Sequence, residues 1–225
     1  MTRILLIRHA ESLKNTRIEF SSTNLDRGLS RGGIEHISAA RDNILRVAAY
    51  LVPGLSEVVC SNSARALETG KLLAEGTRFS VRADATLSSH VVDETAGMTE
   101  QELRDRHPQS SRFLKEYRHG LRSSTTIPFV RESLPDLRHR ARRALLSHGN
   151  ALLVAHRSFL TACLMEAAAS SMAIGRDHFG YVPLDYLHIS MIEKTDDGGL
   201  SLGFVNQPAN ALCKGLEADG WPSDN

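Results

Sequence analysis

Short aliphatic runs separated by amphipathic stretches dominate the pattern of hydrophobic and polar positions along this chain. Three runs are apolar without alternation, which is typical of strands buried on both faces in the middle of an α/β sheet. They cover residues 4–7, 57–60, where Glu57 precedes the apolar residues, and 151–155. Stretches with apolar residues at helical spacing lie between and after them. This alternation predicts an α/β protein, a three-layer α/β/α sandwich with a mostly parallel central sheet.

Several helix starts carry a side chain suited to capping the first turn. Ser30 has this role for one helix, and Ser133 to Asp136 has it for another. Thr99 to Glu102 has the sequence of a capping box. The apolar faces expected after Ser30 and Ser133 are Ile34, Ile37, Ile44 and Leu51, and Leu137, Ala141, Ala144 and Leu145. The arginines between Arg138 and Arg143 could form a phosphate-binding face, but we interpret them as a solvated helix surface, because such runs are commonly exposed.

The C-terminal part predicts a hairpin, and the middle of the chain predicts an insertion. Residues 186–193 alternate apolar and polar side chains, as a half-buried strand does, and residues 200–205 form another strand. Asp197-Gly198-Gly199 between them signals a turn, so we expect an antiparallel edge on the sheet. We expect residues 1–225 to form a single domain, with a helical insertion over the candidate site at about 87–126.

Composition and charge exclude several classes of protein. The chain has 225 residues, 41% of them hydrophobic, and a net charge of +1, which gives no field that would attract nucleic acid or membrane. Cys60, Cys163 and Cys213 are too widely spaced for a zinc pattern and are odd in number. No signal peptide follows Met1, and no apolar run reaches the length of a membrane span. We expect a cytoplasmic protein.

The candidate chemistry lies at the ends of the predicted strands. Arg8 and His9 end the first strand, His156 follows the third, and Arg65 lies at the start of the helix after the second. Because the carboxyl ends of parallel strands share one edge, these four side chains should converge. Two arginines without a carboxylate cluster disfavour a metal site and favour an anion pocket beside a nucleophile. The other histidines, placed on helix surfaces or in loops, are His36, His107, His119, His139, His148, His178 and His188.

Several segments, in order along the chain, resemble the motifs of one family. They are Arg8 to Ser12 with Asn15, Leu29-Ser30 with Gly33, Ser61 to Thr69, Glu132-Ser133 with Arg140, Leu153 to His156, and Asn206 to Leu212. Together they resemble the histidine phosphatase superfamily, which includes cofactor-dependent phosphoglycerate mutases and fructose-2,6-bisphosphatases. His36 and Asn210 depart from that family's usual glutamine and histidine. The resemblance implies a phosphoglycerate mutase-like fold.

The resemblance also implies a metal-independent reaction through a phosphohistidine on His9, with no metal and no cofactor. His9 must be neutral to attack phosphorus. Arg8, Arg65 and also His156, if it is protonated, should lower the pKa of His9. The same three groups would hold the transferring oxygens. Asn15 would be either a further substrate contact or a loop asparagine that satisfies its own backbone.

The sequence departs from the family at the general acid. Members usually carry a glutamate that protonates the leaving alcohol and then activates water. A gapless alignment places Ser89 at that position, and serine cannot do this at neutral pH. His90, Asp93 and Glu94 are close in sequence, and Glu94 is the preferred substitute by residue type. The alternative is that all three are solvated loop residues.

Three functions remain open at the level of sequence. The first is a phosphatase that hydrolyses a small phosphorylated metabolite, which the expected pocket and the compact length favour. The second is a phosphoglycerate-type phosphomutase, against which Ala10-Glu11 argues. The third is a non-hydrolytic phosphoester-binding protein, for which Ser89 is the one indication. The expected partner is a small phosphorylated substrate, and a homodimer is left open.

Overall fold

Six strands form one sheet in the computed structural model, which describes residues 1–17, 26–89, 98–118, 132–171, 182 and 184–218. They are β1 (Thr2–Arg8), β2 (Glu57–Cys60), β3 (Ser80–Ala83), β4 (Ala151–Ala155), β5 (Ile189–Lys194) and β6 (Leu200–Gln207), in the order β3-β2-β4-β1-β5-β6. The pairs from β3 to β1 are parallel, whereas β5 pairs antiparallel with both β1 and β6. The prediction of a mostly parallel sheet with an antiparallel edge is confirmed.

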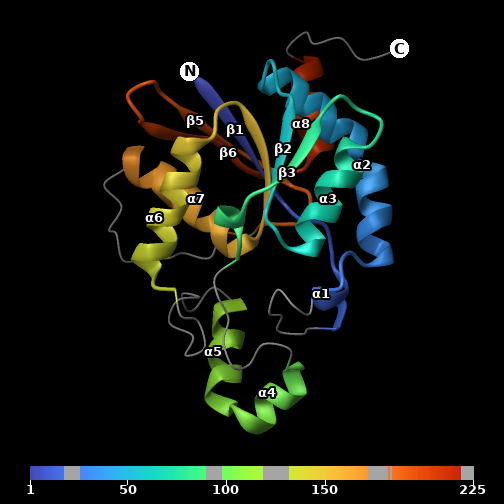
Figure 1. Cartoon of the computed structure of the whole chain (residues 1–225), viewed down its shortest axis with the longest axis vertical. Coiled ribbons are helices and arrows are strands. Elements are labelled where there is room, and N and C mark those ends of the chain that lie inside the picture. Colours follow the sequence, from blue (N-terminus) through green and yellow to red (C-terminus); the bar gives the residue numbers. More distant parts are fainter. Residues whose placement is uncertain (18–25, 90–97, 119–131, 172–181, 183, 219–225) are drawn as a thin grey trace.

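Helices cover both faces of this sheet (Figure 1). On one face lie α2 (Arg31–Leu51), α3 (Ala64–Ala74) and α8 (Ala209–Ala218), and on the other lie α6 (Leu134–Ser147) and α7 (Arg157–Ser171). The short elements are α1 (Leu13–Arg17) and η2 (Ala85–Leu87), and a projecting pair is formed by α4 (Glu100–Arg106) and α5 (Pro108–Arg118). The three-layer sandwich is therefore confirmed.

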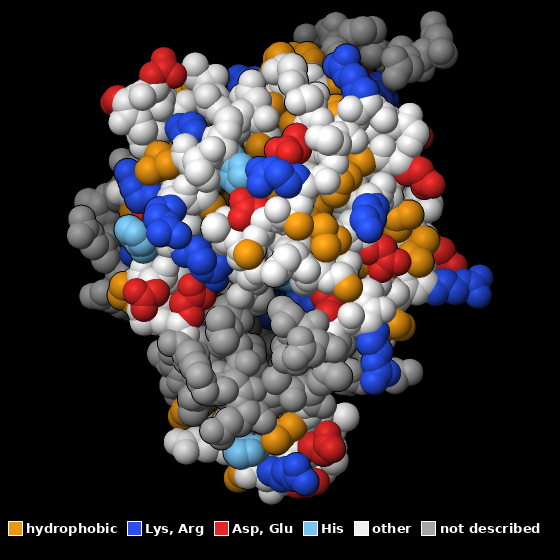
Figure 2. All heavy atoms as spheres, in the orientation of Figure 1, with side chains coloured by type: hydrophobic (Ala, Val, Ile, Leu, Met, Phe, Trp, Pro, Cys, Tyr) orange, Lys and Arg blue, Asp and Glu red, His pale blue; other side chains and the backbone are white. Residues whose placement is uncertain are grey.

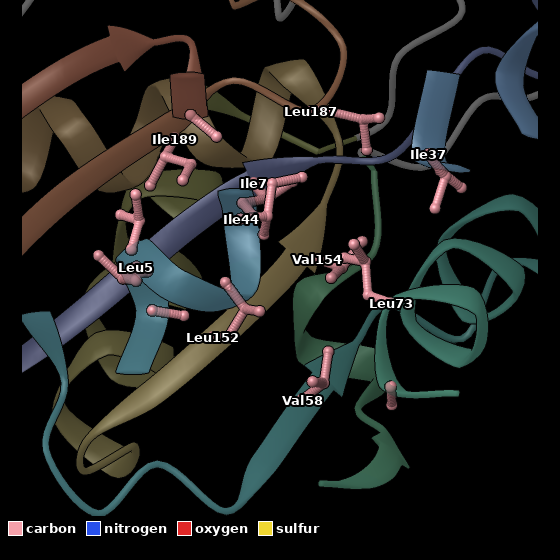
Figure 3. Packing of buried hydrophobic residues seen from close by; sticks show 14 of the residues in the cluster. Leu5, Ile7, Ile37, Ile44, Val58, Leu73, Leu152, Val154, Leu187 and Ile189 are labelled. Carbon is pink, nitrogen blue, oxygen red and sulfur yellow. The ribbon is translucent and has the colours of Figure 1, made fainter. Parts of the chain in front are cut away.

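Alternating side chains of the central strands feed two separate cores. Leu5 and Leu152 point into the cluster beneath α2, α3 and α8, as Figure 3 shows. Ile4, Leu6 and Leu153 belong to the cluster beneath α6 and α7. Both sets are essentially inaccessible to water. Burial on both sides is the reason that these strands are aliphatic runs and do not alternate.

The antiparallel edge differs from its prediction in where it begins and in how deeply it is buried. Leu187 has a φ of 62°, so the backbone turns there and β5 starts only at Ile189. The first four residues of β5 are buried, because β1 and β6 flank the strand and each face carries a core. Even Ser190 is buried, and its hydroxyl accepts a hydrogen bond from the backbone N–H of Asn206 (2.9 Å). The expected half-buried strand is thus wrong.

Several helical predictions hold and others do not. Ser30, Thr99 and Ser133 cap α2, α4 and α6, and Thr99 forms the complete capping box. Ile34 is 40% exposed and does not belong to the buried face of α2. Neither β3 nor α8 was predicted: β3 is a short, mostly exposed edge strand, and the helical spacing of Ala209, Leu212 and Cys213 in α8 was overlooked. Within the described ranges, no helix is both long and apolar enough to cross a bilayer.

Arg138 and Arg140 of α6 are not part of a solvated surface, which corrects the sequence interpretation for these two, whereas Arg143 is exposed as expected. Arg138 Nε lies 2.5 Å from Glu166 Oε1, and both side chains are less than 15% exposed. Arg140 binds both carboxylate oxygens of Glu132 at 2.7 Å. Figure 2 shows basic side chains gathered over α6 with acidic ones beside them. These arginines therefore tie α6 to neighbouring segments, which periodicity alone could not show.

His148 is also placed differently from its prediction as a surface or loop histidine. It is buried, and its Nε2 lies 3.2 Å from Asp84 Oδ2. Burial lowers its pKa, although the nearby Asp84 acts in the opposite direction. The contact joins the end of α6 to the end of β3. His119 and His178 lie outside the described residues.

The start of α2 presses against the loop that follows β1. The Ser30 hydroxyl accepts from Gly33 N–H at 3.0 Å and donates to Glu11 Oε1 at 2.6 Å. A Cβ added to Gly33 would lie 2.1 Å from the Glu11 backbone oxygen, closer than atoms can approach. Glycine is therefore required here for contact between the helix and the loop that carries the candidate site.

Replacing Gly33 with alanine should destabilise the fold by about 1–3 kcal/mol, because the Glu11 backbone must move to admit the methyl group. The matched control is Gly32→Ala, whose Cβ would meet its nearest atom, Glu11 Oε1, at an ordinary 3.5 Å. Because alanine favours helix, that variant should be as stable as the wild type or more stable. Urea denaturation measures both. Equal stability of the two variants would contradict the close-approach argument.

Candidate active site

Three neighbouring strands deliver their C-terminal ends to one place. Arg8 ends β1 and pairs in register with Ala155 at the end of β4, and His9 N–H donates to the Ala155 carbonyl at 3.0 Å. His156 follows directly, so the two imidazole rings lie 5.1 Å apart between centroids. The turn after β2 leads into α3 and supplies Arg65. The predicted convergence of the four side chains is confirmed.

Arg65 lies between the two histidines and contacts both. Its Nε donates to His9 Nε2 at 3.1 Å, and its Nη2 donates to His156 Nδ1 at 3.1 Å. The third nitrogen of the guanidinium, Nη1, lies 2.8 Å from Asp26 Oδ2. Burial lowers the pKa of Arg65 and Asp26 raises it again. The buried guanidinium of Arg65 thus orients both His9 and His156.

The hydrogen bonds of His9 identify its protonation state. Its Nδ1 lies 2.7 Å from the Ala10 carbonyl oxygen, which can only accept, so Nδ1 carries the proton. Nε2 accepts from Arg65 and therefore holds a lone pair. Burial, followed by the charges of Arg65 and Arg8, holds the pKa of His9 well below its ordinary 6.5. A neutral imidazole with an unprotonated Nε2 is the form that a nucleophile requires, once the hydrogen bond from Arg65 is released.

His156 is arranged in the complementary way. Its Nδ1 accepts from Arg65, and its Nε2 lies 2.8 Å from Ser61 Oγ and 3.3 Å from Ser63 Oγ. Because a guanidinium only donates, Nδ1 carries no proton, and the ring is neutral with its hydrogen on Nε2. The protonated His156 considered from sequence does not fit this arrangement.

Arg8 is held by the segment that precedes β5. Its Nη1 donates to the Leu184 carbonyl at 2.7 Å, and its Cζ lies 3.9 Å from the centroid of the Tyr186 ring. That ring also lies 6.0 Å from His9. Burial raises the pKa of Tyr186, so its hydroxyl keeps its proton. Cation–π contact with Tyr186 therefore orients the second arginine of the site.

Other predicted site residues are placed less decisively. Asn15 lies in α1, where its Oδ1 accepts from the Ser12 hydroxyl at 2.6 Å, as a loop-stabilising asparagine would. Ser89 Oγ lies 3.2 Å from Ser158 Oγ, beside the first turn of α7. Glu94, the preferred general acid, lies outside the described residues, as do His90 and Asp93. Among the described residues, no cluster of histidine, cysteine and carboxylate side chains could hold a metal ion.

Sequence reasoning missed Asp26, Tyr186 and Ser61 as members of the site. Asp26 and Arg65 are 39 residues apart, and no local pattern links them. Tyr186 appeared as one position of an alternating strand. Ser61 stood inside a recognised motif, but only the fold shows that its hydroxyl meets His156. Each was missed because its contact is tertiary.

A family model described as "Histidine phosphatase superfamily (branch 1)" matches residues 4–207, which span the sheet and all four converging side chains. The chain belongs to the histidine phosphatase superfamily. No curated protein sequence matches the chain. Membership confirms the family expected from the motifs, and it leaves the individual substrate open.

Solved structures of the same architecture cover nearly the whole chain. YhfR of Bacillus stearothermophilus is 23% identical with a TM-score of 0.68, and the match covers 92% of this chain and 98% of that one. Mycobacterial glucosyl-3-phosphoglycerate phosphatase is 19% identical with a TM-score of 0.69, over 92% and 100%. Phosphoserine phosphatase of Entamoeba histolytica is 18% identical with a TM-score of 0.62, over 92% and 97%. At such identities these matches establish the shared fold.

From the burial and hydrogen bonds of His9 we expect its imidazole to titrate below its ordinary pKa. Because burial holds its folded pKa below 6.5, the imidazole should stay neutral, with its proton on Nδ1, as the pH falls through 6.5. Long-range ¹H–¹⁵N NMR of the histidine side chains measures both the tautomer and the pKa, with His9→Gln to assign the signal. A His9 signal that titrates at 6.5 or above would contradict the argument.

The lowered pKa of His9 also makes the stability of the fold depend on pH. Below 6.5 the unfolded chain binds a proton on His9 that the folded chain does not, so the free energy of unfolding should fall with acidification. The loss begins at the unfolded pKa and ends at the lower folded pKa. His9→Gln removes this group, so its stability should fall less than that of the wild type. Urea denaturation above and below pH 6.5 measures the difference.

Proposed function

We propose that this protein is a metal-independent phosphatase that hydrolyses a small phosphorylated metabolite through a phosphohistidine on His9. The observation that carries the proposal is the neutral, buried His9, whose unprotonated Nε2 lies 3.1 Å from the Nε of Arg65. A nucleophile and an anion-binding cation are thus in contact before substrate arrives. Membership in the histidine phosphatase superfamily supports the same chemistry.

The first step forms the phosphoenzyme. The phosphoryl oxygens take over N–H groups of Arg65 and Arg8, which frees the Nε2 lone pair of His9. That lone pair attacks phosphorus in line as the bond from phosphorus to the alcohol oxygen breaks. The bonding electrons leave with the alcohol oxygen, which then needs a proton. Preorganised donors of this kind typically contribute about 100- to 1000-fold each to the rate.

The second step returns the enzyme to its starting state. The oxygen of a water molecule attacks phosphorus, the N–P bond breaks, and its electron pair returns to Nε2 of His9. The water gives up one proton to the solvent, which balances the proton that the leaving alcohol took up in the first step, and inorganic phosphate leaves. Arg65 and Arg8 can donate to the phosphoryl oxygens in both steps, whereas the Nε2–H of His156 would first have to leave the Ser61 hydroxyl, which lies 2.8 Å away.

Two alternatives differ in where the phosphoryl group goes. A phosphoglycerate-type mutase would return it to the substrate, and a binding protein would not transfer it. The similar structures include a glucosyl-3-phosphoglycerate phosphatase and a phosphoserine phosphatase, which supports hydrolysis of a small phosphorylated substrate. We keep the phosphatase as the proposal and treat residues 1–225 as one catalytic unit.

His9→Ala should lower the release of phosphate by at least ~1000-fold, because the nucleophile itself is lost. The assay supplies no metal and follows phosphate release from phosphosugars, nucleotides and phosphoglycerates. Wild-type protein should also acquire an acid-labile, base-stable phosphoryl group that the variant lacks. His36→Ala, an exposed histidine of α2, is the matched control and should behave as wild type. Isomerised phosphoglycerate without net phosphate would support the mutase, and binding without labelling would support the binding protein.

Substituting glutamate for Ser89 should restore a proton donor for the leaving alcohol. We expect Ser89→Glu to increase the rate with alkyl phosphates, relative to p-nitrophenyl phosphate, by about 100-fold, because only the alkyl leaving group needs the proton. The neighbouring Ser88→Glu is the control, since the Ser88 hydroxyl binds Asn62 at 2.8 Å. Equal loss of both activities in Ser89→Glu would show that this position does not face the leaving group. Wild-type protein that already hydrolyses alkyl phosphates and p-nitrophenyl phosphate at equal rates would indicate a general acid at another position. Glu94 would then be the first residue to test.

A further inference from the structure

Asp26 carries a buried negative charge inside the candidate site. Its side chain is 1% exposed and pairs with Arg65, which is 8% exposed. It comes from the segment that leads into α2, whereas Arg65 belongs to α3, so the pair joins two separate elements. Burial without a partner would be costly for either group. The burial of both charged groups suggests that this ion pair serves the site.

The carboxylate holds Arg65 at both ends of its side chain. Oδ2 accepts from Nη1 at 2.8 Å and lies 3.3 Å from the backbone N–H of the same residue. Oδ1 accepts from the Gly28 N–H at 3.4 Å, which fixes the carboxylate itself. With its backbone and its Nη1 both tied, the long Arg65 side chain loses most of its freedom to rotate. That restriction is what places Nε on His9 and Nη2 on His156.

The carboxylate also competes for the charge that a substrate needs. An incoming phosphoryl group is attracted by Arg65 and Arg8, and Asp26 already neutralises one of these. A carboxylate in direct contact with a buried guanidinium weakens its attraction for a second anion. Product phosphate is such an anion, and it must leave for turnover to continue.

We propose that Asp26 is a positioning residue that holds Arg65 between the two histidines and is a built-in counter-anion that prevents tight retention of phosphate. The inference rests on the proposed function and assigns the control of phosphate affinity in that site to this residue. Two effects of opposite sign follow. Removing the charge should strengthen the binding of phosphate, whereas releasing Arg65 should slow the chemical steps.

Asp26→Asn keeps the size of the side chain and removes its charge. Titration calorimetry with inorganic phosphate should show a dissociation constant lowered by about tenfold, as expected for the loss of one adjacent charge. The kcat for phosphate release should fall. Glu193→Gln removes one charge from the Arg3 pair at the opposite end of β1 and should change neither value. Phosphate binding that is weaker or unchanged in Asp26→Asn would overturn the counter-anion.

A second measurement tests positioning without turnover. The ¹H–¹⁵N signal of Arg65 Nε, protected by its hydrogen bond to His9, should lose that protection in Asp26→Asn. Asp26→Glu keeps the charge but displaces the oxygens, so it should lower kcat while the affinity for phosphate stays within about twofold of the wild type. It also serves if the asparagine variant does not fold. A protected Nε signal in both variants would overturn the positioning role.

Failure of the function and failure of the inference are distinguishable. Wild-type protein that releases no phosphate from any phosphoester would end the proposed phosphatase, while the Nε signal would still report whether Asp26 holds Arg65. Active wild-type protein with an Asp26→Asn variant of unchanged kcat would leave the phosphatase intact and overturn the role of Asp26.

Discussion

The hydrogen bonds from Arg65 to His9 and His156 are the interaction on which the site depends. A guanidinium can only donate, so each histidine nitrogen that it meets must be an acceptor, and both rings are neutral. The same contact keeps a positive charge beside His9, and burial together with this charge holds the pKa of His9 low. Tautomer, charge and orientation of two bases therefore follow from the position of one side chain. A displacement of α3 relative to the sheet would therefore disturb the contacts of Arg65 with both histidines.

A buried cation of this kind needs support from several elements. Asp26 balances its charge, and breaking such a pair by removing one partner typically costs about 3–5 kcal/mol. The segment that carries Asp26 is in turn fixed through Ser30, Glu11 and the close approach at Gly33. On the other side, Arg8 is oriented by Tyr186 and by the Leu184 carbonyl. The fold thus converts packing around the strand ends into a preorganised anion pocket.

The sequence alignment places Ser89 where members of the superfamily usually carry a glutamate. The segment that precedes it is held firmly, because Arg140 donates to the carbonyls of Thr86 and Ser88 at 2.7 and 2.8 Å. The Ser89 hydroxyl faces Ser158, and the pair offers no group that titrates near neutral pH. Under the proposed function, His9 and the two arginines would supply nucleophile and anion pocket, and proton supply to the leaving group would be the step that distinguishes substrates. The choice of leaving group is therefore the sharpest functional question for this protein.

The sequence by itself determined the three central strands, the caps at Ser30, Thr99 and Ser133, and the presence of Arg8, His9, Arg65 and His156 at strand ends. These features are local, since they depend on side-chain periodicity, on backbone N–H groups within one turn, and on the rule that parallel strands end together. The contacts of Asp26 and Tyr186, the burial of His148 and the ion pairs of α6 were decided only by tertiary structure. Each depends on a contact between segments distant in sequence, where burial and charge pairing are properties of the assembled fold and of no single segment.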